Sequence, residues 1–125
     1  MNIGIIGIGY WGKHYIRIVN NNKTCTLKAI SDINKSVLDS YDYLKIKTFL
    51  SYEDMFKENI IDSVVIITNA SIHEKIINCA LKYKLNIFVE KPYTLNSQSC
   101  NLIEKKLDVN HKLMIGHTYL FNSSI

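Results

Sequence analysis

The sequence is poor in the residues that mark several protein classes. Its three cysteines, Cys25, Cys79 and Cys100, are odd in number, widely spaced and form no C-x-x-C pair. This spacing argues against a disulfide framework or a metal site and favours three reduced thiols in the core. No basic leader opens the chain and no apolar run approaches about 18 residues, so we expect neither a signal peptide nor a membrane span, and a cytoplasmic location.

Arginine is almost missing as well. Of the 15 lysine and arginine residues, Arg17 is the only arginine, and the longest basic run is Lys105-Lys106. The net charge of +4 weakly favours anionic partners, but proteins that read nucleic acids use arginine for bidentate contacts. We therefore predict no nucleic-acid partner.

The chain also lacks repeats, linkers and low-complexity stretches, and its single proline is Pro92. With 125 residues, 47% of them hydrophobic, it is long enough for one compact domain with a core and too short for two ordinary ones. We predict one domain spanning residues 1–125.

Strand-like and helix-like segments alternate along this domain. Apolar or β-branched runs predict strands at 2–8, 25–31, 46–49, 63–68, 86–90 and 112–116, and helical periodicity predicts the segments between them as helices. Capping-box patterns place two helix starts at Ser51 and Ser71, the second helix burying a face from Ile72 to Leu81. Such alternation requires parallel pairing and predicts an α/β fold, a doubly wound parallel sheet with helices on both faces.

Three glycines stand where the first strand turns into the first helix. The segment IGIIGIGYWGKHYIRIV, starting at residue 3, spaces Gly7, Gly9 and Gly12 as G-x-G-x-x-G. In this context Gly7 permits the tight turn, Gly9 lets a pyrophosphate approach the backbone, and Gly12 lets helix and strand pack closely. The amides of Tyr10 and Trp11 would then face the phosphates. The alternative is tight packing without a ligand.

An acidic residue supports the dinucleotide interpretation. Asp32 lies twenty positions after Gly12, at the end of the second predicted strand, where a carboxylate can accept both hydroxyls of an adenosine ribose. The alternative is a loop carboxylate or a helix cap. Asp32 would repel a 2′-phosphate and so favours NAD over NADP as the cofactor, although nearby Lys35 weakens that preference.

Two later strand ends carry further candidates. Thr68 ends the fourth strand and Asn69 follows it, with His73 in the first turn of the next helix. Glu90 ends the fifth strand and Lys91 follows it. A lysine at this edge can hydrogen-bond a substrate hydroxyl and exchange the proton that accompanies hydride transfer. The alternatives are a surface ion pair between Glu90 and Lys91 and a solvated His73.

Together these segments resemble the N-terminal domain of the glucose-fructose oxidoreductase, inositol dehydrogenase and rhizopine catabolism (Gfo/Idh/MocA) family of NAD(P)-dependent dehydrogenases. GIIGIGYWG, Asp32, VVIIT leading into T-x-x-x-x-H, VEKP and MIGHTYLFN occur in that family's order, with asparagine and serine replacing family prolines at Asn69 and Ser123. The resemblance implies a Rossmann dinucleotide-binding fold, in which residues 68–73 border the nicotinamide and Lys91 acts beside the reacting carbinol of a sugar or nucleotide-linked sugar.

The resemblance also implies a second domain that holds the substrate. Family members continue into a mostly antiparallel sheet, and this chain ends at Ile125, where that domain would begin. We therefore expect the C-terminal substrate domain to be absent from these residues and their own catalysis to be weak or absent. Exposed Tyr119, Leu120 and Phe121 would favour self-association, and a homo-oligomer is the expected assembly.

Two functions remain open at this point. One is an oxidoreductase module for hydride transfer, with Lys91 assisting the substrate hydroxyl. The other is a non-catalytic NAD-binding sensor or partner subunit. The Rossmann-like domain of a transferase or ligase is disfavoured, because the E-K-P triplet has no evident role there.

Overall fold

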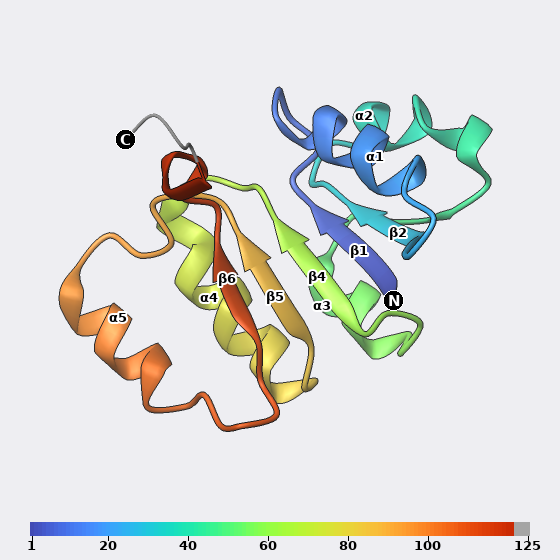
Figure 1. The fold of residues 1–125 in the computed structure, drawn as a ribbon. Coiled ribbons are helices and arrows are strands. Elements are labelled where there is room, and N and C mark those ends of the chain that lie inside the picture. Colours follow the sequence, from blue (N-terminus) through green and yellow to red (C-terminus); the bar gives the residue numbers. More distant parts are fainter. Residues whose placement is uncertain (122–125) are drawn as a thin grey trace.

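The predicted alternation of strands and helices is confirmed (Figure 1). The computed structural model describes residues 1–121, without the side chains of Tyr119 and Phe121, so the expectations for these two side chains and for Ser123 lie outside the described part. The elements are β1 (Asn2–Ile6), α1 (Gly12–Asn20), β2 (Thr26–Ser31), α2 (Lys35–Asp39), the 3-10 turn η1 (Asp42–Leu44), β3 (Lys47–Phe49), α3 (Tyr52–Lys57), β4 (Ser63–Ile66), α4 (Ala70–Lys82), β5 (Asn86–Val89), α5 (Ser97–Glu104), β6 (Leu113–Ile115) and the 3-10 turn η2 (Thr118–Phe121).

The strands form one parallel sheet in the order β3-β2-β1-β4-β5-β6. The register aligns their carboxyl ends, since Ile6 pairs with both Ser31 and Ile66. Farther along, Val89 pairs with Ile66 and with Ile115. The loops that follow these strands therefore leave from one edge of the sheet. The order in which the chain adds strands reverses between β1 and β4, because β2 and β3 lie on one side of β1 and the later strands on the other. Ligands bind at this reversal point in such folds.

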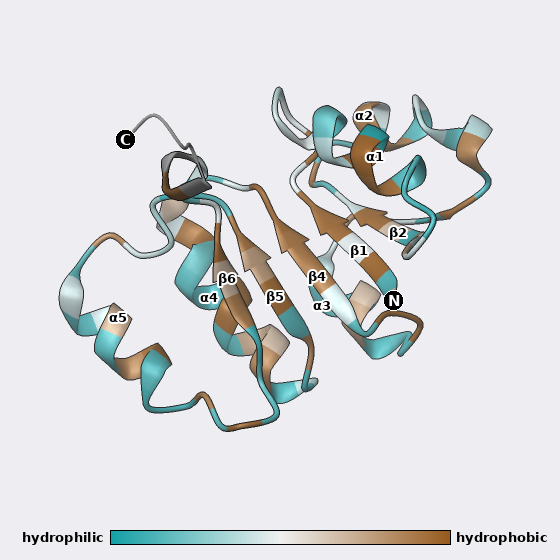
Figure 2. Ribbon diagram, viewed as in Figure 1, coloured by the Kyte–Doolittle hydropathy of each residue, from teal (hydrophilic) through white to brown (hydrophobic). Residues whose placement is uncertain are grey.

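Helices cover both faces of the sheet, as predicted. Because successive side chains of a strand point to opposite faces, Ile5 and Ile30 pack with α1 and α2, whereas Ile6 and Ile66 pack with α3, α4 and α5. The apolar colouring of the strands in Figure 2 follows these two buried clusters. None of the helices within residues 1–121 is long and apolar enough to span a bilayer.

The prediction that the cysteines lie in the core is wrong. Cys25, Cys79 and Cys100 are free and only partly buried. Cys25 and Cys79 pack against the outside of the two buried clusters, so neither core depends on a thiol.

The start of α4 corrects two local expectations. The N-cap is Asn69, not Ser71, because Asn69 has an extended backbone and its carbonyl accepts the N–H of Ile72 at 3.1 Å. The side chain of Ile72 is 42% exposed and does not join the buried face of the helix. By contrast, Ser51 caps α3 as predicted, since its side chain accepts the N–H of Asp54 at 3.2 Å.

Candidate functional site

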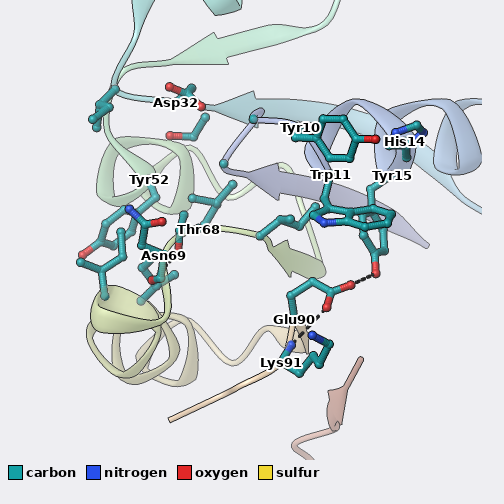
Figure 3. Close-up of a pocket in the computed structure, with 18 of the residues that line it drawn as sticks. Tyr10, Trp11, His14, Tyr15, Asp32, Tyr52, Thr68, Asn69, Glu90 and Lys91 are labelled. Atoms are coloured by element: carbon teal, nitrogen blue, oxygen red, sulfur yellow. Dashed lines mark hydrogen bonds between the residues drawn. The ribbon is translucent and has the colours of Figure 1, made fainter. Parts of the chain in front are cut away.

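A cleft of about 760 Å³ lies at the carboxyl edge of the sheet (Figure 3). This volume falls within the range of about 300–1,000 Å³ that small-molecule sites occupy. The cleft brings together the predicted site residues except Gly12 and His73. Those that line it are Gly7, Gly9, Tyr10, Trp11, Asp32, Thr68, Asn69, Glu90 and Lys91.

Two glycines of the motif are explained by backbone geometry. Gly7 has a φ of +89°, and a β-carbon there would lie 2.7 Å from the carbonyl oxygen of Ile67. A β-carbon at Gly12 would lie 2.2 Å from the carbonyl oxygen of Gly7. Only glycine fits either position, so packing without a ligand accounts for both.

Gly9 is different, because packing gives no reason for it. A β-carbon at Gly9 would meet no atom within 4 Å, and the residue lines the cleft. Glycine here keeps the backbone bare on the side that faces the cavity. This is the arrangement expected where a pyrophosphate approaches the main chain.

The start of α1 supplies donors beside Gly9. The helix has no side-chain cap and no acidic residue in its first turn. The amides of Tyr10, Trp11 and Gly12 have no hydrogen-bond acceptor among residues 1–121. Unpaired amides and the positive end of the helix dipole point to the binding of an anion at this end of the cleft.

Aromatic rings form the wall of the cleft on the side of α1. The ring centroids of Tyr10, Trp11 and His14 lie 5.5 to 5.7 Å apart. Tyr10 is 71% exposed and Trp11 61% exposed. The single tryptophan of the chain therefore stands in the cleft, where a bound ligand would change its surroundings.

Asp32 already holds two backbone groups in place. Its Oδ2 accepts the N–H of Ile8 at 2.8 Å, and its Oδ1 accepts the N–H of Asn34 at 2.9 Å. The carboxylate thus ties the glycine turn to the end of β2, and each oxygen retains a lone pair for a ribose hydroxyl. Lys35, the cation expected to weaken a preference for NAD, pairs with Asp39 at 3.2 Å.

The structure does not bring His73 to the cleft. The side chain is 1% exposed, so the expectation of a solvated residue is wrong. Its Nε2 lies 2.9 Å from the carbonyl oxygen of Thr68, and its Nδ1 lies 2.9 Å from that of Pro92. His73 therefore connects the loops after β4 and β5 from a buried position outside the cleft. Its position five residues after Thr68 in the sequence gave no sign of this.

Glu90 and Lys91 lie at the other end of the cleft, below Trp11 in Figure 3. The Glu90 carboxylate accepts the hydroxyl of Tyr15 and, at 3.1 Å, the backbone N–H of Lys91. The Lys91 side chain is exposed and forms no ion pair within the described part of the chain. The alternative of an ion pair between these neighbours is therefore wrong.

Tyr15 is the site residue that sequence reasoning missed. Helical periodicity by itself places Tyr15 on the apolar face of its helix, and its ring does pack against Phe88 with centroids 5.5 Å apart. The residue nevertheless lines the cleft, and its hydroxyl bonds the Glu90 carboxylate there. Burial, together with the hydrogen bond to Glu90, raises the pKa of Tyr15 far above its usual value of 10.0, so the hydroxyl acts as a donor.

Comparison with known proteins agrees with this geometry. The family described as oxidoreductases with an NAD-binding Rossmann fold matches residues 1–117. An inositol 2-dehydrogenase of Corynebacterium glutamicum is 30% identical over 128 residues, covering 98% of this chain and 38% of that protein. A 2,7-anhydro-N-acetylneuraminate hydratase of Escherichia coli is 22% identical over 126 residues, covering 100% of this chain and 34% of its own length.

The solved structures similar to this one include the scyllo-inositol dehydrogenase of Lactobacillus casei with bound NAD(H) and scyllo-inositol. Its TM-score to this chain is 0.90 at 27% identity, and the match covers 99% of this chain and 38% of that one. The chain thus spans about a third of the length of the proteins that it matches.

Proposed function

Because this chain belongs to the oxidoreductase family with an NAD-binding Rossmann fold, we propose that it is the cofactor-binding part of an NAD-dependent dehydrogenase acting on a sugar, nucleotide-linked sugar or polyol. The observation that carries the proposal is the bare backbone at Gly9, which has no packing explanation. Lys91, a group able to exchange a proton with a hydroxyl, lines the same cleft.

The residues at the start of α1 would bind the diphosphate. The amides of Tyr10 and Trp11 lack acceptors within residues 1–121, and Gly9 leaves room beside them. Asp32, held by the amides of Ile8 and Asn34, would accept the ribose hydroxyls. Its negative charge disfavours a 2′-phosphate, which makes NAD the expected cofactor and NADP the weaker ligand.

Lys91 would assist the substrate. When bound, the nicotinamide supplies the hydride acceptor or donor. The exposed Lys91 side chain would hydrogen-bond the carbinol oxygen. As the neutral amine it would take the hydroxyl proton when the carbinol is oxidised, and as the ammonium it would return that proton in the reverse direction. A substrate domain closing over the cleft would exclude water from this step. We also propose that the assembled protein is a homo-oligomer, since the apolar side chain of Leu120, which follows β6, is exposed.

The substrate class rests on the relatives. Two of the proteins compared are named as inositol dehydrogenases, and a hydratase of a sialic acid derivative is also similar. All three names describe polyhydroxylated ring compounds, which supports a sugar or polyol substrate. Because the relatives carry the names of both dehydrogenases and a hydratase, membership of the family alone does not fix the net reaction.

Titration with NAD and NADP tests the cofactor part of the proposal. Binding would be measured by calorimetry and by the fluorescence of Trp11, the only tryptophan. We expect saturable NAD binding, at least tenfold weaker NADP binding, and loss of affinity in Asp32→Ala. Glu58→Gln, which removes an exposed carboxylate outside the cleft, is the control. If the folded chain binds neither nucleotide, the proposal is wrong.

A further inference from the structure

One hydrogen bond joins α1 to the segment that follows β5. Tyr15, on α1, donates its hydroxyl to Oε1 of Glu90, which follows β5 (Figure 3). Both side chains are partly buried, and the contact spans a sequence separation of 75 residues. The helix that begins at the glycine turn is therefore tied directly to the E-K-P segment.

The Glu90 carboxylate is held on several sides. Its Oε2 accepts the backbone N–H of Lys91 at 3.1 Å. Gly116, after β6, packs against it so closely that a β-carbon there would lie 3.1 Å from Oε2. The tyrosine ring is fixed in turn by its packing against Phe88. The carboxylate consequently has little freedom to turn.

This arrangement keeps the carboxylate away from a nearby cation. An adjacent ammonium is the natural partner of a glutamate, yet Lys91 appears in no ion pair of residues 1–121. Glu90 instead uses one oxygen for the Tyr15 hydroxyl and the other for the Lys91 backbone. The Lys91 ammonium is left exposed at the cleft.

We propose that Tyr15 is a positioning residue for Lys91. By holding Glu90, it fixes the Lys91 backbone and prevents an ion pair between Glu90 and the Lys91 ammonium, which stays free for the substrate oxygen. The role of Lys91 in this statement rests on the proposed function. The geometry between Tyr15 and Glu90 does not, so the two can be tested separately.

The test measures the reactivity of the Lys91 amine in the folded 125-residue chain. Limited acetylation with acetic anhydride at fixed pH, followed by peptide mass spectrometry, gives the labelling rate of Lys91 relative to exposed Lys23. Tyr15→Phe keeps the ring and removes only the hydroxyl. We expect it to slow the labelling of Lys91 roughly threefold, an effect of the size that an ion pair at a partly exposed site supplies. The double variant Tyr15→Phe/Glu90→Gln should restore the original rate.

Two further variants make the result decisive. Tyr43→Phe removes the hydroxyl of an exposed tyrosine outside the cleft and should leave Lys91 labelling unchanged. Glu90→Gln alone should also leave it unchanged, because Lys91 is not paired with Glu90 to begin with. This variant remains informative even if Tyr15→Phe fails to fold.

Three outcomes would overturn the proposal: an unchanged or faster labelling rate in Tyr15→Phe, no restoration in the double variant, or faster labelling in Glu90→Gln alone. NAD titration of the same preparations tests the proposed function separately from the positioning role of Tyr15. A chain that binds no NAD but shows the labelling pattern contradicts the cofactor role and leaves the Tyr15 contact standing.

Discussion

The carbonyl oxygen of Gly7 lies 2.2 Å from the position that a β-carbon at Gly12 would take. At Gly9, between them, a β-carbon would meet no atom within 4 Å. The outer two glycines of the motif are therefore required by the backbone packing, whereas the middle one leaves space in the cleft. Substitutions can distinguish these two roles.

Gly12→Ala should destabilise the fold. The new methyl group would overlap the backbone of Gly7, which cannot move without disturbing the turn after β1. Forced overlap of this kind costs about 1–3 kcal/mol or more. Urea unfolding followed by circular dichroism measures the loss. A variant as stable as the wild type would contradict the close contact between Gly12 and the carbonyl oxygen of Gly7.

Gly9→Ala should behave in the opposite way. No neighbouring atom resists the methyl group, so the free energy of unfolding should stay within about 0.5 kcal/mol of the wild type. The methyl group would project toward the space proposed for the diphosphate and weaken NAD binding by about tenfold, equivalent to about 1.4 kcal/mol. Calorimetric titration checks this. Unchanged affinity would place the diphosphate elsewhere.

Asp32→Ala should lower both stability and NAD affinity. It leaves the partly buried N–H of Ile8 without its acceptor, at a cost of about 1–3 kcal/mol. The exposed N–H of Asn34 can bond to water instead. Asp32→Asn is the matched variant, since its amide oxygen can still accept one of these N–H groups. We expect it to recover part of the stability while reducing the discrimination between NAD and NADP. Equal stability in both variants would contradict the structural role of the carboxylate.

Alkaline pH should destabilise the protein partly through Tyr15. Burial and Glu90 raise the pKa of Tyr15 in the folded state far above 10.0, whereas the unfolded chain loses this proton near pH 10. Above that pH the folded state binds more protons than the unfolded state, so the free energy of unfolding falls as pH rises. Urea unfolding between about pH 9 and 11 should show a shallower fall in Tyr15→Phe than in the wild type.

A wild-type slope in Tyr15→Phe would contradict this prediction. It would mean that folding does not protect the hydroxyl of Tyr15 in the way that its contact with Glu90 requires.

The sequence by itself determined the sheet and most of the cleft. Segments with the apolar pattern of strands alternate with segments that have the pattern of helices, and this alternation requires parallel strands. The glycine spacing and Asp32 are local features whose chemistry depends on a few neighbouring residues. The position of Glu90 and Lys91 at a strand end follows from the same pattern. These local signals are what allowed the family resemblance to be stated from residues alone.

Only the tertiary structure decided which side chains reach one another. The burial of His73, the exposure of Ile72 and the bond from Tyr15 to Glu90 depend on strand order and register. A helical period assigns Tyr15 to an apolar face but cannot specify a partner 75 residues away. Contacts between distant residues form when packing brings their elements together, and for that reason the state of Lys91 was not determined by the sequence around it.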